Sequence, residues 1–528
     1  MTLLVLFLIA VLLLLGARLF VVVGLATMLC FSLILGEGLD PDKLVRIINK
    51  MEGLTTKNVF LSIPMFVAAG TVMTRGGMAA RLIRIATAMV GFLPGGLAIA
   101  SIVACMIFAA ISGSSPVTLV AVGTVMFPAL VAAKYPRDAA MGLLMTAGSL
   151  GCLLPPSIAM LIYAISVSGS SGVDPSDLFL AGSIPALAIS GLLAVYAFFV
   201  GKKSNAPRQP FAFSELMAAL KEGGFALLLP FIVVGGIYSG QFTPTEAGAV
   251  ALMYSVIVCT FVHREMKWSQ LADAFSESAI LIGSLILIVV LAFGLNDFLA
   301  EIEAAARMGT WLREAGLSPF AFLLVVNVAL IGIGALMDSV SATLIFAPLL
   351  APIAVGVYGI DPVHFAVVFV VNMEIGYLMP PVATNLFVGA AIFKEPFGKV
   401  ARAVLPTLGI VCAALVALMY VPTISTGALN MKRGQPVYTA FPWDGKPPPV
   451  VEKAAVVAVP TKGKGMTMEE MMRAAELKLA NDGGVVDAPP PKKKAMTMEE
   501  MMRAADEKLK AEEETAAATV DAGVPPAP

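Results

Sequence analysis

Two groups of small polar residues interrupt otherwise apolar sequence, and each is followed downstream by a Pro-Pro pair. The first group is Ser112-Gly113-Ser114-Ser115, followed by Pro155-Pro156. The second runs from Gly334 to Ser339 and includes Asp338; it is followed by Pro380-Pro381. Broken helices expose N–H donors that suit an anion, and carbonyls and hydroxyls that suit a hard cation such as Na⁺. Breaks of this kind in two corresponding halves predict a transport site.

The two groups repeat in register. Gly113 and Asp338 are 225 positions apart, and Pro155 and Pro380 are separated by the same distance. Small residues and prolines can also serve helix packing and kinks alone, but two copies in register favour a site. The repeat predicts two homologous membrane halves, residues 1–200 and 222–422, joined by a polar cytoplasmic linker at 201–221.

The composition places most of the chain in lipid. Of 528 residues, 58% are hydrophobic and only 13% are charged, and the mean hydropathy is +0.89. Soluble proteins carry about 25% charged residues. A net charge of −1 predicts no nucleic-acid partner, and five cysteines scattered singly with two histidines predict neither a disulfide framework nor a metal centre.

Apolar stretches of spanning length recur along the chain. They cover 1–16, 19–36, 58–74, 139–169, 177–200, 222–239, 244–262, 278–299, 363–393 and 402–422. Two longer stretches, 97–133 and 320–356, carry the polar groups near their middle and predict hairpins that enter and leave on the same side. The fold class expected is an all-α polytopic membrane protein with two inverted repeats, each with a re-entrant helical hairpin and a broken transmembrane helix.

Basic residues predict the orientation. One set of connections is rich in Lys and Arg, whereas the connections at 170–177, 239–243 and 356–362 contain neither. By the positive-inside rule the first set is cytoplasmic. The hairpins then open to opposite sides, and both chain ends are periplasmic, although Lys432 and Arg433 argue against that side for the C-terminus.

The segment 423–528 has a different composition, rich in Pro and charge, which predicts a mostly disordered tail. Within it Met-Thr-Met-Glu-Glu-Met-Met-Arg-Ala-Ala occurs twice and predicts two amphipathic, Met-rich helical segments at 466–479 and 496–509. They are either nascent helices without an essential role or docking helices for a partner or a membrane surface.

Ionisable residues inside apolar segments are costly and therefore informative. Asp338 could neutralise a cation or accept the backbone N–H bonds that hold its hairpin tip. Glu374 is expected to be structural, and Glu246 to cap a helix. The chain has no phosphate-binding loop and no His-Glu-x-x-His, so no enzymatic activity is predicted.

Over residues 1–422 the chain resembles the large membrane (M, DctM-like) subunit of tripartite ATP-independent periplasmic (TRAP) transporters. The stretches that carry the resemblance are Phe108-Ala-Ala-Ile-Ser-Gly-Ser-Ser-Pro116, Leu153-Leu-Pro-Pro-Ser-Ile158, Leu178-Phe-Leu-Ala-Gly182, Gly240-Gln-Phe-Thr-Pro-Thr-Glu-Ala247 and Glu374-Ile-Gly-Tyr-Leu-Met-Pro-Pro-Val-Ala-Thr-Asn-Leu-Phe387. The resemblance implies an elevator-type, sodium-coupled transporter. It also implies two partners, a small four-helix membrane subunit and a periplasmic substrate-binding protein that delivers an organic acid.

The resemblance also implies site residues. One sodium site corresponds to Ser112, Gly113, Ser115 and Pro155, and the second to Gly334, Asp338, Ser339 and Met379. The substrate is expected near Ser114, Ser157, Thr384 and Asn385. This chain has Ala383-Thr384-Asn385 where the family often has Gly-Leu-Asn, and its tail has no counterpart in the family pattern.

The function expected is therefore import of a small organic acid, with a C4-dicarboxylate as the best guess, by the transport subunit of a bacterial inner-membrane complex. Sodium is the coupling ion, and no cofactor or other metal is expected. Two alternatives remain open at this point: a stand-alone sodium:anion symporter without a binding protein, and an uncoupled membrane channel or scaffold.

Overall fold

The computed structural model describes residues 19–30, 58–168, 172–380, 383–439 and 441. These residues form helices and connecting loops, without a strand among them. Eight of their helices are long and apolar enough to cross a membrane. The prediction of an all-α polytopic membrane protein is confirmed. The predicted span at 1–16 and the two Met-rich segments lie outside the described residues.

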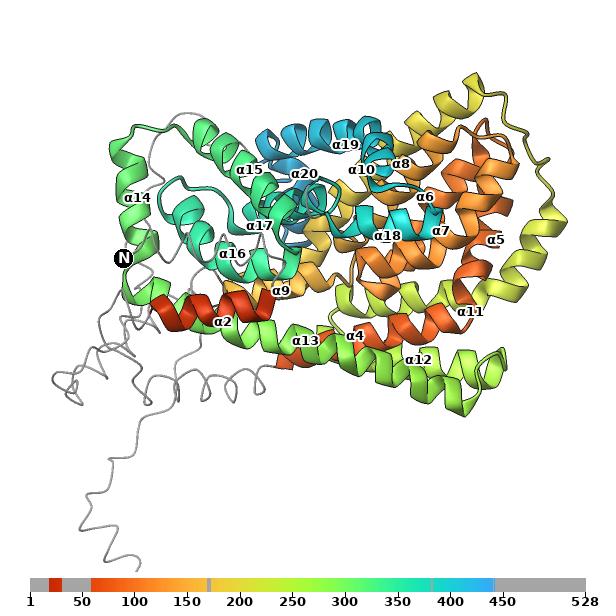
Figure 1. The fold of residues 1–528 in the computed structure, drawn as a ribbon, viewed down its shortest axis with the longest axis horizontal. Coiled ribbons are helices and arrows are strands. Elements are labelled where there is room, and N and C mark those ends of the chain that lie inside the picture. The colour runs from red at the N-terminus through yellow and green to blue at the C-terminus, as the bar shows by residue number, and fades with distance from the viewer. Residues whose placement is uncertain (1–18, 31–57, 169–171, 381–382, 440, 442–528) are drawn as a thin grey trace, which may run out of the picture. The chain divides into compact units, whose positions relative to one another are not determined.

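The helices of the first half are drawn in Figure 1, and all except α5 coincide closely with or lie within predicted apolar stretches. They are α2 (Leu19–Leu29), α4 (Asn58–Arg75), α5 (Met78–Val90), α6 (Gly96–Ser112), α7 (Ser115–Ala132), α8 (Arg137–Ser149), the 3₁₀ helix η2 (Leu150–Cys152), α9 (Ile158–Ser166) and α10 (Pro175–Lys203). The breaks between α6 and α7, and between η2 and α9, fall at the polar group and at the Pro-Pro pair.

The second half follows the same order. Its elements are α11 (Phe213–Tyr238), α12 (Pro244–Ile257), the π-helix η3 (Val258–Val262), α13 (Trp268–Glu301), α14 (Ala304–Glu314), α15 (Pro319–Leu336), α16 (Ser339–Gly356), α17 (Pro362–Gly376), α18 (Thr384–Phe393), α19 (Phe397–Tyr420) and α20 (Thr423–Lys432). Six consecutive pairs, from α5 with α14 to α10 with α19, begin about 225 residues apart, which supports the predicted repeat.

The two halves exchange packing partners. In the first half α9 packs against α16 of the second, and α18 of the second packs against α7 of the first. Similarly, α13 lies along α2 and α12 lies along α4. Helices of each half therefore bury apolar faces of the other half, and one continuous cluster of buried hydrophobic residues includes side chains from both.

The structure differs from the sequence analysis at several boundaries. The linker predicted at 201–221 is helical at both ends, because α10 continues to Lys203 and α11 begins at Phe213. Helix α13 begins ten residues before the apolar stretch predicted at 278–299. The first turns of α13 and α11 contain charged residues, and for this reason the hydropathy pattern did not include these turns in the predicted spans. The segment predicted as tail begins with a helix, α20, and is packed as far as Phe441, which is 5% exposed.

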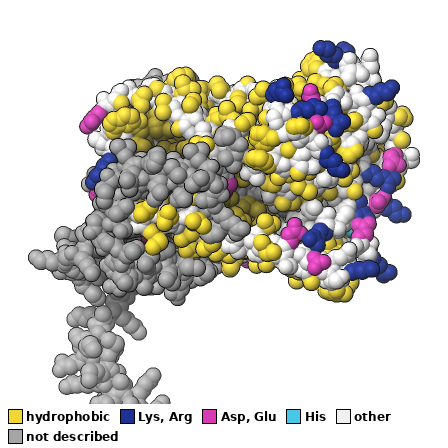
Figure 2. Space-filling model, in the orientation of Figure 1, with side chains coloured by type: hydrophobic (Ala, Val, Ile, Leu, Met, Phe, Trp, Pro, Cys, Tyr) yellow, Lys and Arg dark blue, Asp and Glu magenta, His cyan; other side chains and the backbone are white. Residues whose placement is uncertain are grey.

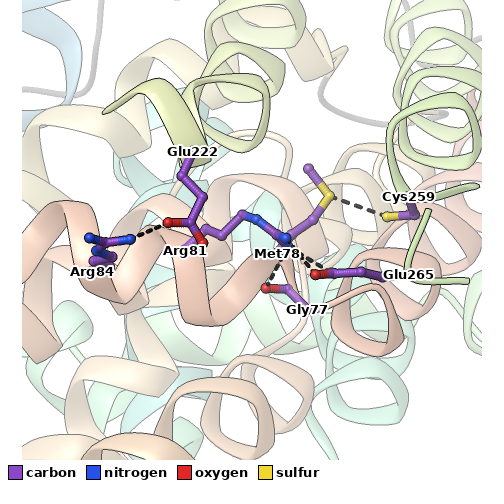
Figure 3. A network of polar contacts seen from close by, with 7 residues as sticks. All are labelled: Gly77, Met78, Arg81, Arg84, Glu222, Cys259 and Glu265. Atoms are coloured by element: carbon purple, nitrogen blue, oxygen red, sulfur yellow. Dashed lines mark hydrogen bonds and ion pairs between the residues drawn. The ribbon is translucent and has the colours of Figure 1, made fainter. Parts of the chain in front are cut away.

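Most charged side chains visible in Figure 2 gather at one end of the face, and hydrophobic side chains dominate the remaining part that is drawn in colour. The ion pairs Arg75–Glu277, Arg84–Glu215 and Arg137–Glu395 join residues of connections that the positive-inside rule assigns to the cytoplasm. Figure 3 shows the pair with the least exposed arginine: Arg81 donates to both carboxylate oxygens of Glu265, at 2.7 and 2.5 Å.

The residues after α19 contact the N-terminal end of α10, whereas Lys202 and Lys203 lie at its C-terminal end. Arg433 pairs with Asp177 in the first turn of α10 at 2.5 Å. The Ser425 hydroxyl lies 2.7 Å from Nδ1 of the buried His364. The described residues 423–439 and 441 are thus part of the folded membrane domain.

Candidate functional site

The two helix breaks have related but unequal geometry. In the first, Gly113 ends α6 in the left-handed region at a φ of 59°, and Ser114 is the N-cap of α7. In the second, Met337 ends α15 in extended backbone, and Asp338 is the N-cap of α16. Ser114 and Asp338 therefore occupy the same structural position, and the repeat is offset by 224 rather than 225 residues at the tips.

Both breaks line one cavity of about 230 Å³. Its lining residues are Val67, Gly70, Ser112, Gly113, Ser114, Ser115, Pro116, Val117, Cys152, Ile158, Ala159, Leu281, Ser284, Leu285, Asp338, Ser339, Val340 and Tyr377. The cavity is smaller than the roughly 300–1,000 Å³ of sites for drug-sized ligands, so it suits a small molecule or ions. Its far wall is formed by α4 and α13, which occupy equivalent places in the predicted repeat.

Asp338 holds its own helix start. Its Oδ2 accepts the backbone N–H of Ser341 at 3.0 Å, and its Oδ1 accepts the Ser341 hydroxyl at 2.7 Å. The carboxylate thus satisfies an orphan donor of α16, which was one of the two roles expected for it. Each oxygen retains a further lone pair, and Asp338 is among the lining residues of the cavity, so the capping role does not prevent contact with a cation.

Ser339 and Ser112 present hydroxyls at the two tips. The Ser339 side chain is 3% exposed and lines the cavity. Its oxygen forms no hydrogen bond of ordinary geometry, although the Tyr377 hydroxyl lies beside it. The Ser112 hydroxyl lies 2.9 Å from that of Thr118. An unpartnered buried hydroxyl costs free energy unless something binds it. Ser339 therefore points to a ligand in the cavity.

The structure separates the remaining predicted residues into two groups. Asn385 is buried behind the first tip and donates to the Ser115 hydroxyl at 2.6 Å. Neither Asn385 nor the others line the cavity. Ser157 caps α9, Gly334 packs against Gly376, Pro155 precedes a cis peptide bond, Met379 is 38% exposed and Thr384 opens α18. Their predicted ligand contacts stay predictions.

Sequence reasoning missed the walls of the cavity. Ser284 and Leu285 come from the middle of α13, and Gly70 comes from α4. These residues sit in uniformly apolar stretches without a local break. The one available signal was that 58–74 and the second half of α13 occupy equivalent places in the repeat. Tyr377 and Cys152 were also missed, although they too are related by 225 positions.

The fold and the doubly broken site define a polytopic helical membrane transporter. Among solved structures, the Alcanivorax borkumensis YdaH transporter has the same fold, with a TM-score of 0.52, 15% identity, and coverage of 76% of this chain and 91% of the other.

The sequence comparisons then give the family. Residues 6–424 match the family described as "Tripartite ATP-independent periplasmic transporter, DctM component". The C4-dicarboxylate TRAP transporter large permease protein DctM of Pseudomonas aeruginosa is 41% identical over 408 residues, which are 77% of this chain and 92% of the relative. The isethionate TRAP transporter permease protein DctMQ of Oleidesulfovibrio alaskensis is 37% identical over 370 residues, 69% of this chain and 57% of the relative.

This chain belongs to the DctM family and is a large permease subunit of a TRAP transporter. It is a multi-pass protein of the bacterial inner membrane, and its relatives are transporter subunits rather than enzymes. The resemblance described from the motifs is confirmed.

Proposed function

We propose that this permease subunit imports a small organic acid, with a C4-dicarboxylate as first candidate, in symport with Na⁺. The observation that carries the proposal is the single cavity lined by both helix breaks. The DctM relative is named for C4-dicarboxylates and the DctMQ relative for isethionate, so both named substrates are small organic anions.

The cavity can hold an anion without a basic side chain. No Lys, Arg or His is among its lining residues. The first turns of α7 and α16 begin at Ser115 and Ser339 and carry backbone N–H groups and the positive ends of helix dipoles. Together with the tip hydroxyls, these donors suit a carboxylate, and a bound cation would offset the remaining negative charge.

Sodium fits the donor set of both tips. Hard cations prefer oxygen ligands, and the tips offer the Asp338 carboxylate, the Ser339 hydroxyl and backbone carbonyls. The Gly113 carbonyl accepts only a long bond of 3.4 Å from the Ile158 N–H. When bound, sodium would supply positive charge beside the anion and link its own gradient to transport.

The arrangement also supports an elevator movement. The cavity lies between the broken helices on one side and α4 and α13 on the other. We infer that α6–α9 and α15–α18 move as a block against α4 and α13, which would expose the cavity to each side in turn. We further propose that a small four-helix membrane subunit and a periplasmic binding protein assemble with this chain.

Uptake of labelled succinate by reconstituted vesicles tests the proposal. We expect uptake to require an inward sodium gradient, the small subunit and the binding protein. Replacing the unpartnered hydroxyl (Ser339→Ala) should raise the sodium concentration for half-maximal uptake by roughly tenfold, about 1.4 kcal/mol, and Asp338→Asn should raise it as well.

Ser190→Ala is the matched control, because the buried Ser190 hydroxyl on α10 is bonded to the Ala186 carbonyl at 2.7 Å and lies outside the cavity lining. Full-rate uptake without sodium would overturn the coupling. Uptake without the other two components would favour a stand-alone symporter.

A further inference from the structure

Glu374 is a carboxyl group buried between the two halves of the protein. It lies in the last turn of α17 and is 1% exposed, and no charged side chain of the described residues pairs with it. Its carboxylate oxygens form no hydrogen bond of ordinary geometry, although the Ser149 hydroxyl and the Cys152 thiol lie beside them. Among the ion pairs of the described residues, none includes it. An unpaired ionised carboxylate in such surroundings is strongly disfavoured, so the group is expected to carry a proton.

The repeat places Glu374 at the junction of the two broken helices. The offset of 225 relates Glu374 to Ser149, and Tyr377 to Cys152. Ser149 and Cys152 adjoin the Glu374 carboxyl, and Tyr377 is near enough to Cys152 and Glu374 to interact with them electrostatically. Since Cys152 and Tyr377 also line the cavity, these two side chains connect the carboxyl to the site proposed for transport.

The surroundings of Glu374 suit a proton better than a sodium ion. Na⁺ needs several oxygen ligands, whereas this carboxyl meets a thiol and a single hydroxyl. That hydroxyl, on Ser149, already donates to the Thr146 carbonyl at 2.9 Å. A proton requires only the carboxyl itself and one acceptor, and the Ser149 oxygen can accept.

Few other titratable groups face this carboxyl. Helices α15 and α16, which pack against α17, contain no Asp, Glu, Lys, Arg or His. In α9 the one titratable side chain is Tyr163, in η2 it is Cys152, and Tyr377 and then Asp338 lie toward the cavity. In α10, α19 and α20 the charged residues stand near the helix ends. Glu374 is thus the one carboxyl inside this part of the described core.

We propose that Glu374 is a proton-binding site and that its proton travels with the substrate through the transport cycle. One O–H bond forms when the carboxylate takes a proton from water on the periplasmic side, through the cavity. The same bond breaks when the proton passes to water on the cytoplasmic side. The inference rests on the proposed function, because it assigns Glu374 to that same cycle.

Infrared spectroscopy of the reconstituted full-length complex tests proton binding directly. We expect a protonated-carboxyl band in the wild type that disappears when the pH is raised and is absent from Glu374→Gln. Glu277→Gln, which removes an exposed carboxyl paired with Arg75, should leave the band unchanged. A wild-type spectrum in which no such band depends on Glu374 would overturn proton binding, whatever the outcome for transport.

Vesicle uptake of labelled succinate between pH 7 and pH 8, at a fixed sodium gradient, tests whether the proton travels. For one proton per cycle, an inward gradient of one pH unit should raise the steady-state accumulation ratio of the wild type about tenfold. Glu374→Gln should lose this response but retain succinate exchange, which needs no net proton movement. Glu374→Asp should restore the response.

The outcomes are distinguishable from failure of the proposed function. A wild type without any response to the pH gradient, or a Glu374→Gln variant that keeps it, would overturn proton transport while sodium-driven uptake could stand. If Glu374→Gln loses exchange while Glu374→Asp shows a normal pH response, the glutamine variant is misfolded. The pH response of Glu374→Asp would then decide whether a carboxyl at this position carries the proton. Absence of succinate uptake in the wild type would contradict the proposed function, while the infrared result would still decide proton binding.

Discussion

At the scale of single residues, two glycines set the distance between α15 and α17. A Cβ added to Gly376 would lie 2.6 Å from the backbone of Gly334, and one added to Gly334 would lie 3.0 Å from the Cα of Gly376. The atoms in the way belong to the backbone, so no side chain can rotate to make room. Gly334, predicted as a sodium-site residue, has this packing role in the structure.

Gly376→Ala is therefore expected to destabilise the protein by roughly 1–3 kcal/mol, the usual cost of overpacking a core. It should also lower uptake, because the tip of α15 and Glu374 both depend on this contact. Gly332→Ala is the control, since nothing lies within 4 Å of a Cβ at that position, which is on α15 two residues before Gly334. Thermal unfolding of the purified protein measures both, and equal stability of the two variants would contradict the packing argument.

Sequence reasoning succeeded for residues whose type is unusual in its surroundings. Serines, Asp338 and paired prolines inside apolar segments indicated the breaks, and the structure places six of the predicted residues in the cavity lining. The bond from Asn385 to Ser115 could not be predicted in the same way. It joins residues 270 positions apart, and only the exchange of partners between α18 and α7 brings them together.

At the scale of elements, the amphipathic helix α5 is fixed to the second half by charge. The Arg81 side chain is 12% exposed, and its two-pronged contact with Glu265 joins α5 to the connection between η3 and α13 (Figure 3). Hydrogen bonds from Arg81 lower the pKa of the Glu265 carboxyl. Arg84 contacts Glu215 and Glu222 on α11 beside it.

Glu265→Gln should lower the melting temperature at pH 7, with a cost of roughly 1 kcal/mol for this partly exposed pair. Because the pKa of Glu265 is lower in the folded state, its contribution is complete above the unfolded value of about 4.3 and is lost as the pH falls through the folded pKa. The gap between wild type and variant should therefore close at low pH.

Thermal unfolding in detergent at pH 7 and pH 3 measures that gap, with Glu277→Gln as the control because its pair with Arg75 is exposed on both sides. A gap that stays constant down to pH 3 would show that the variant acts through something other than the charge. The positive-inside rule identified Arg81, but its partner could not be predicted, since the rule concerns sides of the membrane and not contacts between loops.

At the scale of the whole molecule, hydropathy gave the order of the spans, and the 225-residue offset gave the correspondence between elements of the two predicted halves. The offset did not give the pairing of α9 with α16 or of α18 with α7, because these contacts join residues far apart in the sequence. It also could not give the extent of the charged helix ends. In α11 and α13 the polar first turns extend the helix beyond the apolar segment. Outside the bilayer a helix does not require apolar residues, so hydropathy could not predict where these helices begin.

The C-terminal side is where basic residues gave conflicting signals. Lys432 and Arg433 predict a cytoplasmic end, whereas the number of spans predicts a periplasmic one. The structure pairs Arg433 with Asp177 at the start of α10. Helix α10 has 29 residues, roughly 44 Å in length, and ends at Lys202 and Lys203 on the other side. Because Arg433 is paired with Asp177, it adds no net charge to its side of the membrane. The positive-inside rule therefore does not assign this residue to the cytoplasm.

Residues 433–441 are therefore expected on the periplasmic side. Tyr438 is 76% exposed, so a cysteine placed there (Tyr438→Cys) should react with a membrane-impermeant maleimide in intact spheroplasts. A cysteine at the exposed Arg208 (Arg208→Cys), in the connection between α10 and α11, should react only after permeabilisation. Cys30, Cys105, Cys152 and Cys259 are buried, and the partly exposed Cys412 lies in the middle of the apolar helix α19; Cys412→Ser in the background removes its labelling. Labelling in the reverse order would place α20 in the cytoplasm, and Arg433 would then count as an ordinary cytoplasmic anchor despite its contact with Asp177.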